Sequence, residues 1–192
     1  MTGELPKILS LLLLSYLLGS FPSGYLVGEI FKKTDVRQWG YGDTGATNTW
    51  KTVGRGLGAL VGVLDIGKGM LATLLPLWVG VPYLAVWTGF LAVAGHIWPV
   101  FIGFRGGKGL ATFIGVALVL ATVPLIICLA LWLALKPAIR LVALANLVAF
   151  SFLPVFALLG QKSTGMTLGF VALASLRWCV EWPHLKRAKR HK

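Results

Sequence analysis

Long uninterrupted apolar runs constrain this chain more than any other feature. Rich in Leu, Val, Ala and Ile, they cover residues 6–31, 56–79, 83–100, 110–135, 141–159 and 164–182. Only 12% of the residues are charged, whereas a soluble domain carries about 25%. The runs are continuous rather than alternating, which favours helices over barrel strands, and only helices or closed barrels satisfy the backbone in lipid. The sequence therefore predicts an all-α, polytopic transmembrane bundle that forms a single domain over residues 1–192.

The run at 110–135 decides the number of helices. It could be one long helix, or Thr122-Val123-Pro124 could divide it into segments at about 110–121 and 123–135. With the division there are about seven helices, the N-terminus lies outside and the C-terminus lies in the cytoplasm. Almost all basic residues, including those of the tail at 184–192, then face the cytoplasm, as the positive-inside rule requires. We therefore expect seven helices, although each half would span only about 20 Å of a ~30 Å hydrocarbon core.

The first apolar run is expected to remain attached as a helix and to bend. It is too long for the apolar core of a signal peptide, and no small-residue cleavage site follows it. Pro22 cannot donate a backbone hydrogen bond and crowds the carbonyl of Leu18, which predicts a kink or an unwound turn. Ser20 and Ser23 could satisfy the backbone groups that the kink frees, or they could face a ligand.

The net charge of +12 would suggest nucleic acid as the partner of a soluble protein. In a membrane protein it is explained first by topology and by anionic lipid headgroups, and the sequence contains no nucleic-acid-binding pattern. It also lacks a carboxylate cluster for Mg²⁺, an HExxH or GxSxG motif and a Cys/His pair. Metal-dependent hydrolysis and a serine nucleophile are therefore disfavoured, and we expect no metal and no cofactor.

The longest polar interval, residues 40–51, is called the first glycine loop. Its three glycines allow positive φ angles and can turn N–H groups to one side, which suits an anion. Thr, Asn, Lys and Arg side chains add hydrogen bonds and positive charge. The loop therefore predicts a phosphate-type site, against the alternative of a flexible connection between two helices. The candidate binding residues are Gly40, Gly42, Asp43, Thr44, Gly45, Thr47, Asn48, Lys51 and Arg55.

Residues 104–112, called the second glycine loop, have a related composition. A glycine pair, a lysine and another glycine that opens a helix would bring N–H donors and the positive end of the helix dipole to an anion. The spacing differs from GxxxxGK[ST], so this is not a Walker A loop. The candidate binding residues are Arg105, Gly106, Gly107, Lys108 and Gly109.

Three further polar residues lie inside or at the end of apolar runs. His96 precedes the second glycine loop and could be a general base, a phosphate ligand or a cap of its helix. Asp65 and Lys68 are three positions apart and share a helix face. Charges in a membrane segment normally pair or face a polar cavity. The two could form a structural pair, or Asp65 could hold Lys68 toward a phosphate.

In order and spacing, these motifs resemble those of the bacterial acyl-phosphate:glycerol-3-phosphate acyltransferases. The resemblance covers nearly the whole chain and is carried by residues 19–25, 40–48 with Lys51, 65–69 and 95–112. It implies a seven-helix enzyme of the bacterial cytoplasmic membrane, with its active site facing the cytoplasm. The chain departs from the family pattern at Tyr41, at Lys51 and in the C-terminal segment, where His184 is a weak match.

The resemblance also implies a reaction. A fatty acyl group would move from acyl phosphate to the sn-1 hydroxyl of glycerol-3-phosphate, giving lysophosphatidic acid and inorganic phosphate, the first step of phospholipid synthesis. Two phosphates would occupy the glycine loops beside Lys51, Arg55, Lys68 and Lys108, and the base would be His96 or a substrate phosphate. Membrane lipids and a soluble enzyme that makes acyl phosphate are the expected partners.

Two other functions stay open at this point. A transporter or channel for a phosphorylated solute would require inverted repeats and broken helices that meet at the membrane midplane. A lipid-headgroup adaptor without activity would not need two paired loops. In this sequence the polar motifs gather toward one face and no repeat is evident, which favours the acyltransferase.

Overall fold

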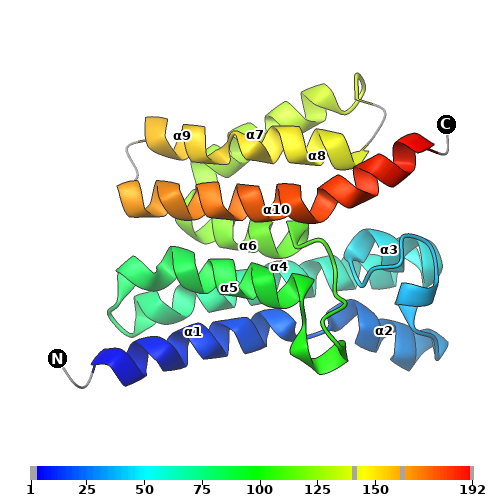
Figure 1. The fold of residues 1–192 in the computed structure, drawn as a ribbon, viewed down its shortest axis with the longest axis horizontal. Coiled ribbons are helices and arrows are strands. Elements are labelled where there is room, and N and C mark those ends of the chain that lie inside the picture. Colours follow the sequence, from blue (N-terminus) through cyan, green and yellow to red (C-terminus); the bar gives the residue numbers. More distant parts are fainter. Residues whose placement is uncertain (1–3, 140–141, 161–162, 191–192) are drawn as a thin grey trace. The chain divides into compact units, whose positions relative to one another are not determined.

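The computed structural model describes residues 4–139, 142–160 and 163–190, which form helices, turns and loops with no strand in these ranges (Figure 1). The predicted all-α membrane class is confirmed, and each of the seven expected segments contains helix. The chain packs as two compact units, Met1–Val119 and Leu120–Lys192; the single domain and the orientation of the termini stay predictions. Within the described ranges, three stretches are long and apolar enough to cross a membrane: Glu4–Lys32, Arg55–Trp78 and Pro82–Ile102.

The break predicted in the first apolar run occurs at Phe21 and Pro22. Helix α1 (Glu4–Ser20) ends just before these residues, and α2 (Ser23–Lys32) begins just after them. Pro22 has no N–H to continue the helical ladder of α1. The first run is therefore two helices, and the break leaves backbone groups that other elements must satisfy.

Helix α1 packs along α5 (Ala85–Ile97), and both contact α4 (Arg55–Trp78) (Figure 1). Glycine makes this contact close: a Cβ at Gly19 would lie 2.1 Å from the carbonyl oxygen of Ala92, and one at Gly95 would lie 2.3 Å from that of Tyr16. Such close backbone approach is typical of membrane helices with small residues at their interface. This packing places the C-terminal end of α5 beside the α1–α2 break.

The segment between α2 and α4 is more ordered than the expected loop. It contains a short 3₁₀ helix, η1 (Val36–Gln38), and a helix, α3 (Ala46–Thr52). Helix α3 begins within the first glycine loop, directly after Gly45, and carries Lys51 in its last turn. Two further 3₁₀ helices, η2 (Pro82–Leu84) and η3 (Val100–Ile102), flank α5.

The run at 110–135 is divided, as expected. Helix α6 (Leu110–Leu120) ends before Ala121, whose backbone is not helical (φ −149°, ψ 54°), and α7 (Thr122–Leu135) follows. Pro124 lies in the first turn of α7, where its missing N–H has no helical partner to lose. The proline therefore marks the start of the second helix rather than a kink within one helix.

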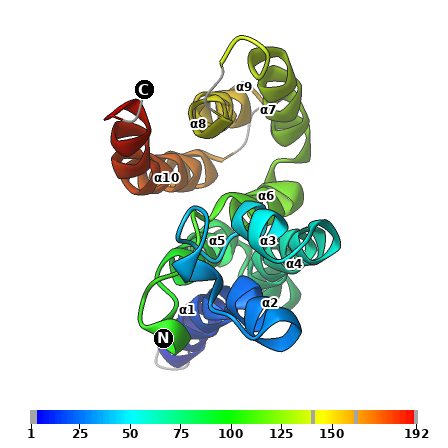
Figure 2. The ribbon, with the colours of Figure 1, turned by 90° about the vertical axis from the view of Figure 1, so that its right-hand side faces the viewer.

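In the second unit, α8 (Val142–Ser151) and α9 (Leu153–Leu159) lie between α7 and α10 (Thr164–Arg190) (Figure 2). Phe152 separates α8 from α9, and Pro154 lies in the first turn of α9. Helix α10 continues past residue 182, the expected end, because residues 185–190 are mostly strong helix formers. The side chains from 184 onward, His184 among them, lie outside the described part of the chain.

Candidate functional site

The two glycine loops meet at the C-terminal end of α5. The N–H of Thr44 in the first loop donates to the carbonyl oxygen of Gly106 in the second (3.4 Å). A Cβ placed on Gly107 would lie 3.3 Å from the backbone nitrogen of Gly45 and 2.3 Å from His96 Nε2. The structure thus brings together three predicted parts of the site, the two loops and His96.

The first glycine loop is organised by one buried side chain. The Oδ1 of Asn48 accepts from the N–H of Tyr41 (2.7 Å), and its Nδ2 donates to the carbonyl oxygens of Val36 (2.8 Å) and Asp43 (2.7 Å). Asn48 is fully buried. It therefore shapes the loop from inside, whereas the sequence alone suggested a residue that faces the ligand.

Several N–H groups of the first loop already have acceptors. That of Gly45 donates to Asp43 Oδ1 (2.9 Å), and that of Gly42 donates to the carbonyl of Trp39 (3.1 Å). Gly40 and Gly42 have φ angles of +62° and +75°, which allow these tight turns. Exposed Thr47 lies at the start of α3, where the first N–H groups of a helix have no helical acceptor.

The second glycine loop is held by backbone contacts with α5. The N–H of Gly106 donates to the carbonyl of Ile97 and that of Gly107 to the carbonyl of His96, both at 3.1 Å. A Cβ on Gly106 would lie 2.0 Å from the His96 carbonyl oxygen, so only glycine fits. Gly109 has a φ of +78° and leads into α6. In this loop the glycines permit close packing, and the side chains of Arg105 and Lys108 carry the charge.

Tyr41 joins the cations of the two loops; in the sequence it was noted only as a departure from the family pattern and was given no role in binding. The Lys51 ammonium contacts the Tyr41 hydroxyl and lies 4.3 Å from the ring centroid. Lys108 Nζ lies 5.7 Å from the same centroid. Cations are attracted to aromatic faces within about 6 Å. An aromatic residue inside a glycine-rich polar loop was the only available signal.

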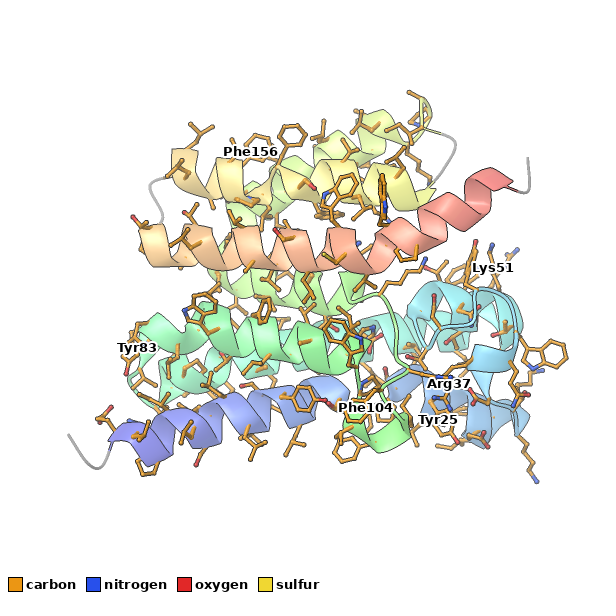
Figure 3. All side chains as sticks on the ribbon, viewed as in Figure 1. Tyr25, Arg37, Lys51, Tyr83, Phe104 and Phe156 are labelled. Carbon is orange, nitrogen blue, oxygen red and sulfur yellow. The ribbon has the colours of Figure 1, made fainter. Side chains whose placement is uncertain are left out.

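An ion pair that the sequence did not single out joins the segments that precede the two glycine loops. Arg37 forms a salt bridge with Asp35 (2.7 Å) and donates to the carbonyl oxygen of Ile102 (2.7 Å). Its guanidinium lies 5.0 Å from the centroid of Tyr25 (Figure 3). The hydrogen bonds from Arg37 hold the pKa of Asp35 below its usual range, against the opposing effect of burial.

A pocket of about 470 Å³ opens next to this pair. It is lined by Asp35, Arg37, Gln38, Gly42, Ile102, Gly103 and Arg105. Arg105 is exposed there, and Arg55 is exposed in the first turn of α4. Both predicted cations can therefore approach a ligand from solvent, although they belong to different elements.

Below the loops, the carboxylate of Asp65 gathers three side chains. Ser23 Oγ donates to Asp65 Oδ1 (2.5 Å), Lys68 Nζ lies 2.9 Å from the same oxygen, and His96 Nδ1 lies 3.4 Å from it. All four side chains are buried. The predicted Asp65–Lys68 pair is therefore formed, and it includes two residues from other helices.

Lys68 also serves the break in the first apolar run. Its ammonium donates to the carbonyl oxygen of Phe21 (2.9 Å), one of the groups freed between α1 and α2. The two serines were candidates for this task. Instead, Ser23 donates to Asp65, and Ser20 is buried with Oγ 3.0 Å from the Cβ position of Gly95. Lys68 is thus bonded within the protein in this structure.

The arrangement suits the handling of an anionic substrate beside a proton acceptor. Lys51 and Lys108 from the two loops lie at the ring of Tyr41, and the Nε2 of buried His96 lies where the loops meet. Among the described residues, no three His, Cys, Asp or Glu side chains are placed to hold a metal ion. The residues present can bind phosphate by charge and move a proton at His96.

Comparison with known proteins relates this geometry to a family. A family model described as glycerol-3-phosphate acyltransferase matches residues 9–191. The glycerol-3-phosphate acyltransferase of Synechococcus sp. (strain CC9902) is 45% identical over 172 residues, which cover 88% of this chain and 86% of that protein. The protein of the same name from Desulforudis audaxviator (strain MP104C) is 44% identical over 165 residues, which cover 85% of this chain and 83% of that protein.

Two crystal structures of PlsY (YgiH), an integral membrane glycerol 3-phosphate acyltransferase, also match. The glycerol 3-phosphate form has a TM-score of 0.89 at 29% identity, and the lysphosphatidic acid form has a TM-score of 0.86 at 27% identity. Each match covers 96% of this chain and 93% of that chain. With the family model matching nearly every residue, the chain belongs to the glycerol-3-phosphate acyltransferase family of integral membrane proteins.

Proposed function

We propose that this protein transfers a fatty acyl group from acyl phosphate to the sn-1 hydroxyl of glycerol-3-phosphate. The products are lysophosphatidic acid and inorganic phosphate. The observation that carries the proposal is the meeting of two glycine loops, with Lys51 and Lys108 on one tyrosine ring, beside buried His96. The similar PlsY structures, in glycerol 3-phosphate and lysphosphatidic acid forms, support the acceptor and the product.

Binding of the two phosphates is proposed to depend on side-chain charge. Lys51 and Lys108 are already close to each other through Tyr41, and Arg55 and Arg105 are exposed near the loops. Many loop N–H groups are bonded within the protein, so they shape the site more than they bind the anion. Lys68 stays a prediction as a phosphate ligand, because its ammonium already donates to Asp65 and Phe21.

The proposed chemistry is a direct acyl transfer. The sn-1 hydroxyl oxygen attacks the carbonyl carbon of acyl phosphate, the carbon–oxygen bond to phosphate breaks, and phosphate leaves with the bond electrons. Positive charge near the loops favours the developing oxyanion. The hydroxyl proton goes to His96 Nε2 or to a substrate phosphate, whose second pKa is about 6. Because the acyl group is already activated, no covalent enzyme intermediate is needed.

The membrane supplies the rest of the proposed site. The long apolar helices can lie along the acyl chain, while the polar loops stay near the headgroups. We place the protein in the bacterial cytoplasmic membrane with the loops toward the cytoplasm, because the basic residues then follow the positive-inside rule. A soluble enzyme that makes acyl phosphate would deliver the donor from that side.

The test uses purified protein in lipid, a long-chain acyl phosphate and glycerol-3-phosphate, without metal or coenzyme A. Release of inorganic phosphate and formation of lysophosphatidic acid are followed together, and equal amounts are expected. Phosphate without lysophosphatidic acid would make the protein a hydrolase. If neither product forms, the acyl-transfer proposal is wrong, and flux of phosphorylated solutes into liposomes would then test the transporter.

A lysine variant locates the site. Lys108→Ala should abolish turnover while the protein still inserts and folds, because it removes a phosphate-binding cation whose side chain is only half-buried. Lys7→Ala is the matched control, because Lys7 lies near the start of α1, far along the helix from the glycine loops, and donates to the carbonyl of Val79 at the end of α4. Undiminished turnover in Lys108→Ala would show that the site lies elsewhere.

A further inference from the structure

The buried carboxylate of Asp65 stands between the α1–α2 break and the glycine loops. One of its oxygens, Oδ1, accepts a hydrogen bond from Ser23 Oγ (2.5 Å) and forms a salt bridge with Lys68 Nζ (2.9 Å). The same oxygen lies 3.4 Å from His96 Nδ1. Asp65 is fully buried and His96 is 5% exposed. Two donors from α2 and α4 therefore hold the carboxylate in place, with Oδ1 toward the imidazole of α5.

The other ring nitrogen of His96 lies where the two glycine loops meet. His96 Nε2 lies 2.3 Å from the Cβ position of Gly107, and the same position is 3.3 Å from the backbone nitrogen of Gly45. A neutral histidine has one N–H and one lone pair, and the partner of one nitrogen decides the state of the other. An ionised carboxylate is an acceptor only, so beside Asp65 the hydrogen belongs on Nδ1.

We propose that Asp65 is a positioning residue, which accepts the Nδ1–H of His96 and thereby presents the lone pair of Nε2 to the meeting point of the two glycine loops. The inference rests on the proposed acyl transfer and names its proton acceptor. The sn-1 hydroxyl proton passes to Nε2 as the oxygen bonds the acyl carbon, and phosphate leaves with the electrons of the broken bond. The departing phosphate can then take the proton from the imidazolium, which restores neutral His96.

The 3.4 Å separation fits such a role in a protein without substrate. Catalytic hydrogen bonds are often long before substrate binds and shorten in the reactive complex. The group that is hydrogen-bonded to the non-reacting ring nitrogen of a histidine commonly selects the tautomer and fixes the ring orientation. Ser23 and Lys68 would then act indirectly: they fix the position of the Asp65 carboxylate, which in turn orients the imidazole of His96.

Nitrogen-15 NMR of histidine-labelled protein in micelles tests the tautomer directly. The chain has 3 His residues, and His96→Gln identifies the signal of His96 by its loss. In the wild type at neutral pH we expect the Nδ1–H tautomer. Observation of the Nε2–H tautomer at His96 would overturn the proposal without any variant of Asp65.

Asp65→Asn tests the consequence for catalysis. An amide can donate to Nδ1 and favour the Nε2–H tautomer, which has no lone pair for the substrate proton. We expect kcat to fall roughly 10²- to 10⁴-fold, with little change in KM. Thr73→Val is the matched control, because it removes another buried hydrogen bond of α4, to Gly69, and keeps side-chain volume. A wild-type kcat in Asp65→Asn would contradict the proposal.

A second pair of variants covers a failure of Asp65→Asn to fold, since that change leaves the Lys68 cation buried and unpaired. Asp65→Asn/Lys68→Met removes both charges, which proteins often tolerate, and should show the Nε2–H tautomer. Lys68→Met alone should keep the Nδ1–H tautomer of His96. Loss of this tautomer in Lys68→Met would mean that Lys68, and not Asp65, sets the tautomer. If the wild type makes no lysophosphatidic acid, the acyl-transfer proposal fails even where the tautomer is as expected.

Discussion

The two glycine loops have similar compositions and are stabilised in opposite ways. The first is built around the buried side chain of Asn48, which makes three hydrogen bonds to the surrounding backbone. The second has no such side chain at its centre; Gly106 and Gly107 lie directly on the backbone of α5 and donate to its carbonyls. The first loop should therefore be sensitive to removing a side chain, and the second to adding one.

Gly106→Ala should produce the largest effect. The new Cβ would lie 2.0 Å from the His96 carbonyl oxygen, and a backbone atom cannot move aside as a flexible side chain can. We expect the free energy of unfolding to fall by at least about 3 kcal/mol and kcat/KM to fall roughly 100-fold, because a displacement near 1 Å has that cost. Denaturation in lipid or detergent and product formation measure the two effects.

Gly56→Ala is the control for this change. No atom lies within 4 Å of a Cβ at Gly56, in the first turn of α4. Alanine favours helix over glycine, so stability should be unchanged or slightly higher. If Gly106→Ala behaved like Gly56→Ala, the second loop would not be packed against α5 as described.

Asn48→Ala should be the next most disruptive change. It leaves the N–H of Tyr41 and the carbonyls of Val36 and Asp43 without their partner. Buried unsatisfied groups are costly, and we expect a loss of about 2 kcal/mol in the free energy of unfolding. Gln38→Ala removes an exposed amide from neighbouring η1 and should stay within about 0.5 kcal/mol of the wild type. Equal stability of the two variants would contradict the side-chain scaffold of the first loop.

Tyr41→Phe tests the contact between the loops. The ring stays near Lys51 and Lys108, but the hydroxyl that contacts the Lys51 ammonium is lost. A hydrogen bond to a charged group at an exposed site contributes about 1 kcal/mol, so KM for the phosphate substrates should rise roughly fivefold with kcat little changed. Tyr83→Phe, which changes an exposed side chain of η2 (Figure 3), should leave both constants unaltered. An unchanged KM in Tyr41→Phe would show that the hydroxyl does not position Lys51.

The smallest effect is expected from the Asp35–Arg37 pair. Its hydrogen bonds lower the pKa of Asp35 in the folded protein, so its stabilisation is complete above the unfolded value of about 3.9 and is lost as pH falls through the folded value. The difference in Tm between the wild type and Asp35→Asn should be constant from neutral pH to about pH 5 and shrink in stronger acid. A difference that grew on acidification would have the wrong sign for this pair.

The sequence by itself determined the class of the protein and much of its outline. Continuous apolar runs require helices in lipid, so the all-α class followed without tertiary information. Pro22 and the Thr122-Val123-Pro124 segment marked two of the interruptions, because proline acts locally through its missing N–H. The order and spacing of the loops, His96 and Asp65 were sufficient to indicate the family. These features depend on residue type and near neighbours.

Only the tertiary structure decided what each polar residue does. Asn48 is internal rather than ligand-facing, Lys68 bonds to Phe21, and Tyr41 joins the two lysines. The sequence suggested an Asp65–Lys68 pair because the residues are three apart on a helix, but it could not add Ser23, 42 positions away, or His96. Hydrogen bonds between distant residues depend on how closely helices approach, and here glycines at helix contacts set that distance.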